Sequence, residues 1–204
     1  MGEISVDVTG VILAGGESSR MGRNKAFLEV GGERLVDRAV SLLEGLFEEL
    51  ILIANDLSAY AYLGLRTLPD RFPGKKSLGG IHTALLHMKT PYCFVAACDM
   101  PFLKEGLVRY LLSLREGYEV VVPRLDWGLE PLCAVYSQAC LKPIERLLNR
   151  GDLKIINFFP EVRVCEVARD DLMRFDPELD SFFNINTPED LARANRLLSE
   201  KKVT

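Results

Sequence analysis

The fold is decided by the stretch Val11-Ile12-Leu13-Ala14-Gly15-Gly16-Glu17-Ser18-Ser19-Arg20-Met21-Gly22-Arg23-Asn24-Lys25. An apolar run typical of a buried strand ends at two adjacent glycines, and polar and basic residues then lead to Lys25. Glycine lets backbone N–H groups approach an anion closely, and Arg20 and Lys25 add charge that suits phosphate oxygens. The spacing matches neither the P-loop nor Gly-x-Gly-x-x-Gly. The stretch predicts an anion site after a strand, with an ordinary surface turn as the alternative.

Short apolar runs alternate with amphipathic segments along the chain. We expect strands at Val8–Leu13, Leu50–Ala54, Leu65–Leu68, Tyr92–Ala97, Glu119–Val122, Leu132–Tyr136 and Val162–Val167. We expect helices at Arg34–Glu49, Gly80–His87, Leu103–Leu114, Gln138–Leu148 and Pro188–Ser199, and a turn at Gly31-Gly32. Such alternation predicts right-handed crossovers. The expected fold class is α/β, a Rossmann-like three-layer α/β/α sandwich with a mostly parallel central sheet, formed by one domain over residues 1–204.

Composition excludes several classes of protein. The 204 residues are 48% hydrophobic and 26% charged, as in ordinary globular proteins. A net charge of −4 argues against general nucleic-acid binding. The start of the chain carries Glu3 and Asp7 and does not resemble a secretory signal, and no apolar run is long enough to span a membrane. Five cysteines without a Cys-x-x-Cys pair, beside only two histidines, make a structural zinc site improbable. We expect a cytoplasmic protein that binds neither nucleic acid nor membrane.

Polar side chains follow several of the predicted strands. Asn55, Asp70 and Asp99 each come at or just after the end of a strand, so the carboxyl-edge rule for parallel sheets places them near the Gly15–Lys25 loop. Asp99 is either a turn residue or a ligand for a hard cation such as Mg²⁺, which takes one or two carboxylates together with substrate phosphates. Asn55 and Asp70 either hydrogen-bond a base or ribose, or serve turn chemistry.

Two further motifs have both a binding and a structural interpretation. Gly79-Gly80 lies ahead of a predicted helix, where it is either a backbone approach to an anion or a plain helix start. Asn184 and Asn186 share one side of an extended stretch before the helix that begins at Pro188. They either contact a metal or phosphate, or bond their own turn.

The glycine-rich stretch, with Ser19-Arg20-Met21-Gly22 and Lys25, resembles the signature of sugar-nucleotide-type nucleotidyltransferases. The full set resembles the molybdenum cofactor guanylyltransferases more closely. That set adds Asp70, Leu78-Gly79-Gly80, Asp99-Met100-Pro101, Glu130–Tyr136 and Asn184-Ile185-Asn186-Thr187-Pro188. The resemblance spans nearly the whole chain. It departs from the family at Lys75-Lys76-Ser77, where a glycine–proline pair is common.

The resemblance implies the nucleotide-diphospho-sugar-transferase fold, with a nucleotide-binding part at about residues 8–120 and an acceptor-binding part at about 121–200. It implies that GMP passes from GTP to the terminal phosphate of molybdenum-molybdopterin, with release of pyrophosphate, and that molybdoenzyme maturation proteins are candidate partners. GTP would be bound by Leu13, Ala14, Gly15, Gly16, Lys25, Asn55, Asp70, Gly79 and Asp99. Lys25, Arg20 and Asp99 would be catalytic, with Asp99 as the ligand of the Mg²⁺ cofactor. Asn184 and Asn186 would lie near the acceptor or the metal.

Two other functions stay open on the residues alone. One is transfer of a different nucleotide, such as CMP from CTP, to molybdopterin or to another phosphorylated acceptor. The other is a nucleotide-binding regulatory module without turnover. The metal carboxylate argues against the second, because binding alone does not require it.

Overall fold

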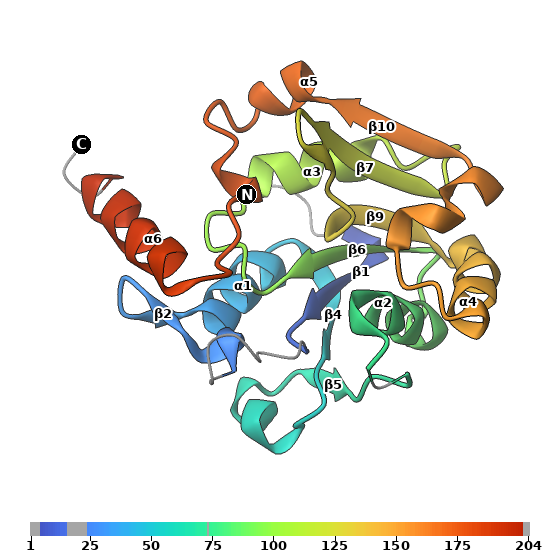
Figure 1. Ribbon diagram of the computed structural model, residues 1–204, viewed down its shortest axis with the longest axis horizontal. Coiled ribbons are helices and arrows are strands. Elements are labelled where there is room, and N and C mark those ends of the chain that lie inside the picture. Colours follow the sequence, from blue (N-terminus) through green and yellow to red (C-terminus); the bar gives the residue numbers. More distant parts are fainter. Residues whose placement is uncertain (1–4, 16–23, 73, 202–204) are drawn as a thin grey trace.

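A computed structural model describes residues 5–15, 24–72 and 74–201 of the chain (Figure 1). The described strands form a central eight-stranded sheet and a small two-stranded hairpin. The strands of the central sheet are β1 (Ser5–Leu13), β4 (Phe47–Ile53), β5 (Arg66–Leu68), β6 (Tyr92–Ala97), β7 (Val120–Leu125), β8 (Gly128–Leu129), β9 (Cys133–Ser137) and β10 (Val164–Ala168). Their order is β10-β7-β9-β6-β1-β4-β5, with β8 paired to β7.

The pairing is parallel through β6, β1, β4 and β5 and between β10 and β7, whereas β9 runs antiparallel to both of its neighbours. The chain returns from β7 to β9 through the short strand β8, and a connection of that length can join only antiparallel strands. The expected mostly parallel sheet is confirmed. Among the seven described strands in the order given above, only β9 runs in the opposite direction.

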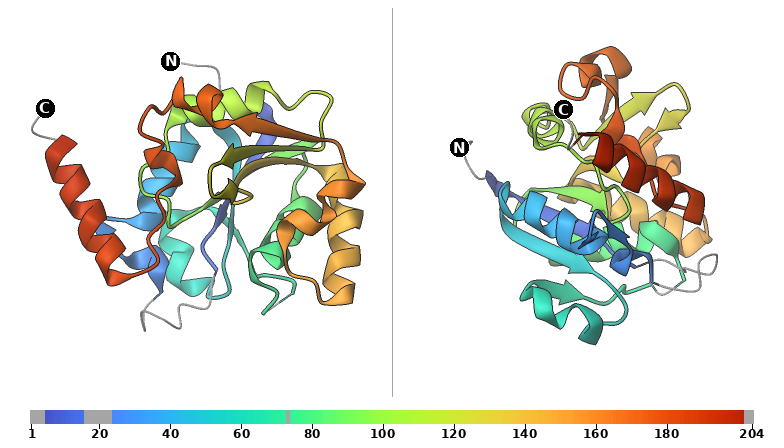
Figure 2. Two further views of the ribbon diagram at one scale, coloured as in Figure 1. Left: turned by 45° about the horizontal axis from the view of Figure 1, so that its top comes forward. Right: turned by 90° about the vertical axis from the view of Figure 1, so that its left-hand side faces the viewer.

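Helices cover both faces of the sheet, as Figures 1 and 2 show. The α-helices are α1 (Leu35–Glu44), α2 (Lys76–His87), α3 (Glu105–Ser113), α4 (Leu141–Arg150), α5 (Arg169–Met173) and α6 (Pro188–Lys201). Alternate residues of β1 enter two different cores, because successive strand side chains point to opposite faces. Ile12 packs with α1 and α3, whereas Val11 packs with α2 and α4. The three-layer α/β/α arrangement is therefore confirmed. Among the described residues, no helix has the length and apolar content needed to cross a membrane.

Helix α1 is shorter than expected. The sequence predicted a helix over Arg34–Glu49, but the helix ends at Glu44 with Gly45 as its C-cap, and β4 already begins at Phe47. Phe47 and Leu50 are both buried in the core that also contains α1, and the backbone of β4 pairs with β1. Hydrogen bonding to the sheet and burial of Phe47 therefore override the helical period of the sequence.

Two other helix starts also differ from expectation. Helix α2 begins at Lys76 rather than Gly80, and Lys76 itself has a left-handed φ of 53°. The segment expected to be helical from Gln138 is a short 3-10 helix, η3 (Gln138–Cys140), followed by α4. Pro143 lies in the first turn of α4, where a missing N–H needs no helical partner.

The expected Gly31-Gly32 turn is confirmed and connects the two-stranded hairpin β2 (Glu29–Val30) and β3 (Glu33–Arg34). Both glycines have positive φ, at 65° and 84°, which suits a tight two-residue hairpin turn. A Cβ added to Gly31 would lie 2.2 Å from Leu198 Cδ2, and the Gly31 N–H donates to Asn195 Oδ1 at 2.9 Å. Helix α6 therefore packs directly on this turn, beside β2 at the edge of the molecule (Figures 1 and 2).

Candidate active site

A cavity of about 150 Å³ opens where β1 and β6 end. This is the carboxyl edge of the sheet, where α/β proteins bind their ligands. The residues that line it come from both strand ends, from the short helical turn at Lys25, from the start of α2 and from the segment before β9: Leu13, Ala14, Gly15, Asn24, Lys25, Ser77, Ala97, Cys98, Asp99 and Leu132. Five of the residues predicted to bind GTP are thus together: Leu13, Ala14, Gly15, Lys25 and Asp99.

Lys25 connects three parts of the chain. It is the first residue of the 3-10 helix η1 (Lys25–Phe27), whose N-cap Asn24 accepts the Ala26 N–H at 3.1 Å. Its ammonium lies 2.8 Å from Asn186 Oδ1 and 3.5 Å from Asp99 Oδ2. A cation is therefore held between a carboxylate and an amide oxygen at the cavity wall, where it can meet an anionic ligand.

Asp99 lies two residues beyond the end of β6, and its side chain is 20% exposed. Burial raises the pKa of this carboxyl group, and the nearby Lys25 ammonium opposes that rise. The Asp99 carbonyl accepts the Ile185 N–H at 3.0 Å, so the backbone of Asp99 also anchors the segment that carries Asn186.

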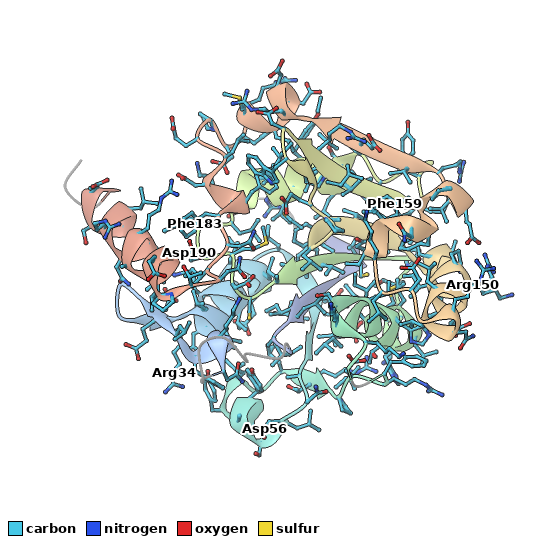
Figure 3. The ribbon with its side chains drawn as sticks, in the orientation of Figure 1. Arg34, Asp56, Arg150, Phe159, Phe183 and Asp190 are labelled. Carbon is cyan, nitrogen blue, oxygen red and sulfur yellow. The ribbon has the colours of Figure 1, made fainter. Side chains whose placement is uncertain are left out.

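The two asparagines before α6 differ in their contacts. Asn186 reaches Lys25, whereas the side chain of Asn184 donates to Phe182 O at 3.0 Å, within its own turn. Asp190 fixes the segment by accepting the N–H groups of Asn186 and Thr187, at 2.9 and 2.8 Å. Thr187 Oγ1 in turn accepts the Asp190 N–H, which confirms the expected N-cap. Phe183 and Asp190, which flank this segment in the sequence, are labelled close together beside the start of α6 in Figure 3.

Asn55 and Asp70 form a separate group outside the residues that line the cavity. Asn55 Oδ1 accepts the Asp70 N–H at 3.3 Å. Asp70 Oδ1 accepts the Phe72 N–H at 2.9 Å and lies 3.5 Å from the Thr83 hydroxyl. Burial raises the pKa of Asp70, and these hydrogen bonds oppose the rise. Asp70 therefore organises the turn that leads toward α2.

Gly79 has a packing role that the sequence did not predict. The glycine pair does not precede the helix but lies inside α2, and the Gly79 N–H donates to Lys75 O. A Cβ at Gly79 would lie 2.8 Å from Asp70 Oδ1 and 3.1 Å from the Phe72 carbonyl oxygen. Gly79 thus lets the Asp70 turn pack against the helix.

The predicted residues Gly16 and Arg20 lie outside the described residues. Nearby, the Ala14 N–H donates to Ile53 O at 3.0 Å, so this amide belongs to the sheet and is not offered to an anion. The Leu13 carbonyl likewise accepts the Cys98 N–H at 3.2 Å. These bonds fix the end of β1 between β4 and β6.

The sequence did not single out Asn24, Ser77 or Cys98 as cavity residues. Ser77 belongs to the segment that departs from the family pattern, and this departure could have marked it as a candidate for the site. Cys98 is buried, and burial raises the pKa of its thiol to about 12, so it lines the wall as a small neutral group. Asn24 carried no signal beyond its place before Lys25.

The residues around Asp99 fit a Mg²⁺ ion that is shared with a substrate. Among the described residues, no group of three or more His, Cys, Asp or Glu side chains is arranged to hold a metal. Asp99 offers one carboxylate. The amide oxygen of Asn186 is close to it, because both groups contact the ammonium of Lys25. Magnesium commonly binds through one or two carboxylates, substrate phosphates and water, so a single carboxylate is sufficient for such a site.

Residues 10–163 match the model of the MobA-like NTP transferase domain. The chain is 44% identical to a probable molybdenum cofactor guanylyltransferase of Pelotomaculum thermopropionicum, over 98% of this chain and 97% of the relative. It is 38% identical to a molybdenum cofactor guanylyltransferase of Desulfosudis oleivorans, over 97% and 98%. The crystal structure of molybdopterin-guanine dinucleotide biosynthesis protein A from Archaeoglobus fulgidus matches with a TM-score of 0.84 and 31% identity, over 95% of this chain and all of that one. The chain therefore belongs to the MobA-like NTP transferases and is a nucleotidyltransferase.

Proposed function

We propose that the protein transfers GMP from GTP to the terminal phosphate of molybdenum-molybdopterin, which yields the guanine dinucleotide cofactor and pyrophosphate. The observation that carries this proposal is the contact of Lys25 with both Asp99 and Asn186 at the wall of the cavity. The relatives named guanylyltransferases cover nearly the whole chain, which supports guanine as the base.

The reaction is a displacement at the α-phosphorus of GTP. An oxygen of the acceptor phosphate forms a bond to the α-phosphorus as the bond to the β-phosphate oxygen breaks, and pyrophosphate leaves with that electron pair. The acceptor is already an anion, so the reaction needs no strong base. The difficulty lies in bringing two anions together and in stabilising the charge of the transition state, which positioning and electrostatics can achieve.

Lys25 would bind the phosphates, together with Arg20, and stabilise the charge that develops on them. Asp99 would hold Mg²⁺, which when bound neutralises charge on the pyrophosphate. Asn186 accepts a hydrogen bond from Lys25 and so orients the ammonium along the cavity wall. Asn184 is proposed to lie near the acceptor or the metal.

The nucleoside would lie along the same edge of the sheet. Leu13, Ala14, Gly15 and Gly16 would contact GTP where β1 ends. Asn55 and Asp70 would contact the guanosine, with Gly79 close to Asp70. Both hydrogen bonds that the Asp70 carboxylate accepts are on Oδ1, so Oδ2 is suited to a ribose or base donor. We further propose that residues 1–204 form one domain, that residues 121–200 bind the acceptor, that the enzyme works in the cytoplasm and that maturation proteins receive its product.

The test is incubation of the protein with GTP, Mg²⁺ and molybdenum-loaded molybdopterin, followed by mass detection of the guanine dinucleotide. Lys25→Ala should lower transfer by about 10²-fold or more, as expected when an electrostatic group at a transition state is lost. Lys89→Ala is the matched control, because exposed Lys89 lies before β6 begins, at the opposite edge of the sheet. Equal activity of the two variants would contradict the role of Lys25.

The nucleotide and the turnover are tested in the same assay. Competition among GTP, CTP and ATP, read as pyrophosphate release, should favour GTP. A preference for CTP would mean that the protein transfers CMP instead of GMP. Binding of GTP without pyrophosphate release, in the presence of the acceptor, would support a regulatory module instead.

A further inference from the structure

Tyr60 lies outside the residues predicted for the site, yet it is buried close to it. It belongs to the 3-10 helix η2 (Ser58–Leu63), which connects β4 to β5, and it is 1% exposed. Its ring stacks on Phe27 of η1, with centroids 5.0 Å apart. Buried tyrosines usually have a hydrogen-bond partner for the hydroxyl group, so the contacts of Tyr60 Oη are informative.

The hydroxyl group of Tyr60 contacts two residues that line the cavity. It donates to the Ala14 carbonyl oxygen at 3.2 Å and accepts from Asn24 Nδ2 at 2.9 Å. Ala14 follows β1, and Asn24 precedes Lys25. One buried oxygen thus joins the end of the central strand to the start of η1, across sequence separations of 46 and 36 residues.

Asn24 connects the Tyr60 hydroxyl group to the helix that begins at Lys25. Its Nδ2 donates to Tyr60, and its Oδ1 accepts the Ala26 N–H, so both ends of the amide are bound. As the N-cap of η1, Asn24 sets the direction in which the helix begins, and Lys25 is the first residue of that helix. The Lys25 ammonium must reach Asn186 and Asp99 from this starting point.

We propose that Tyr60 is a positioning residue for nucleotidyl transfer. Its hydroxyl group fixes Ala14 and Asn24 relative to each other and thereby holds Lys25 at the site of phosphate binding. This inference rests on the proposed function. Effective catalysis depends on reacting groups being held in place, and small misplacements are costly. Burial raises the pKa of Tyr60 to about 12, so the hydroxyl keeps its proton and its bond to Ala14 throughout the neutral pH range.

The test is Tyr60→Phe, which keeps the ring stacked on Phe27 and removes only the hydroxyl group. We expect kcat for GMP transfer to fall about 10-fold while KM for GTP changes less than twofold, because the loss acts on orientation rather than on binding. Tyr62→Phe is the matched control in the same 3-10 helix. Tyr62 is exposed and its hydroxyl group donates to Asp37 Oδ1 at 2.5 Å, away from the residues that line the cavity, so kcat should stay at the wild-type value.

A double-mutant cycle with Lys25→Ala separates positioning from a general structural effect. If Tyr60 acts through Lys25, Tyr60→Phe should have almost no further effect on kcat in the Lys25→Ala background. The same 10-fold loss in both backgrounds would overturn the inference, as would an equal loss in Tyr62→Phe.

Asn24→Ser provides a second route if Tyr60→Phe folds poorly. Serine is a good N-cap and is too short to keep the bond to Tyr60, so kcat should fall as in Tyr60→Phe. Wild-type kcat in Asn24→Ser would overturn the inference. Transfer by the wild-type protein is measured in the same series. If the wild-type protein releases no pyrophosphate from GTP, the proposed function fails, whereas wild-type turnover with an unaffected Tyr60→Phe refutes only the inference.

Discussion

Asp99 and Asp70 occupy equivalent places at the same edge of the sheet, and both are partly buried, but their carboxylates have different kinds of partner. Each lies two residues after a strand, β6 for Asp99 and β5 for Asp70. The carboxylate of Asp70 accepts hydrogen bonds from residues 2 and 13 positions away, within its own turn and the next helix. Asp99 Oδ2 lies 3.5 Å from the ammonium of Lys25, 74 positions away in the sequence, at the wall of the cavity. The first carboxylate organises local backbone, whereas the second is paired with a cation that only the tertiary fold can supply.

The comparison predicts its largest effect for Asp99→Asn. We expect GMP transfer to fall by about 10²-fold or more, since the charge that would hold Mg²⁺ is lost. The amide has nearly the same shape, so the protein should stay folded, with a thermal unfolding midpoint no lower than that of the wild type. Transfer rates and calorimetry together check this. A variant that keeps its activity would place Asp99 in the same structural class as Asp70.

Gly79→Ala should have the next largest effect, and on stability rather than chemistry. The new methyl group would lie 2.8 Å from Asp70 Oδ1 and 3.1 Å from a backbone oxygen, so the turn must move. We expect the free energy of unfolding to fall by about 1–3 kcal/mol, the usual cost of overpacking. Urea denaturation measures this.

Gly80→Ala is the matched control for that experiment. Its methyl group would meet Leu13 Cδ2 at 3.1 Å, the end of a flexible side chain, so a smaller loss is expected. Equal losses in the two variants would mean that crowding of the Asp70 turn is not the cause.

Asp70→Asn tests whether the Asp70 turn also binds nucleotide. The amide oxygen can still accept the Phe72 N–H, but the acceptor on the second oxygen is lost. We expect KM for GTP to rise about 5-fold with kcat unchanged, which corresponds to one hydrogen bond of about 1 kcal/mol. Steady-state kinetics at saturating acceptor gives the two constants. A fall in kcat without a change in KM would assign Asp70 a role like that of Asp99.

The smallest expected effect is on the pH dependence of stability. Burial raises the pKa of Asp70 in the folded protein, so the folded state binds this proton more tightly than the unfolded state. The stability that protonated Asp70 contributes is fully present below the ordinary aspartate pKa of about 3.9 and is lost as pH rises through the raised value. Urea unfolding from pH 4 to 7 should therefore show the wild type losing stability relative to Asp70→Asn. An opposite slope would mean that the hydrogen bonds outweigh burial.

The sequence was most informative where a signal is local. Apolar runs identified the strands that carry the site, and the edge rule for parallel sheets brought Lys25 and Asp99 together correctly. The prediction from sequence failed at the end of α1, because Phe47 fits the helical period of apolar residues although it belongs to strand β4. The sequence also failed at α2, since Lys75, which precedes the helix, is not a residue type that caps helices, and Gly79 was therefore placed outside the helix.

Long-range contacts account for what the sequence could not predict. Both asparagines before α6 were candidates, but only the fold shows that Asn186 reaches Lys25 while Asn184 turns back. In the sequence, Tyr60 resembles any aromatic residue of a core, and no neighbouring residue indicates that its hydroxyl group contacts both Ala14 and Asn24. Residues of this kind act through partners that are distant in the sequence.

The contact between Lys25 and Asn186 has a consequence for the order in which the enzyme is made. The two residues are 161 positions apart, and the segment that carries Asn186 is secured by α6 on the Gly31 turn. On the ribosome, β1, β6 and the residues Ala14 and Asp99 that follow them emerge long before Asn186 does. A nascent chain can therefore present the residues that line the cavity, the last of which is Leu132, before Lys25 acquires its hydrogen bond to Asn186.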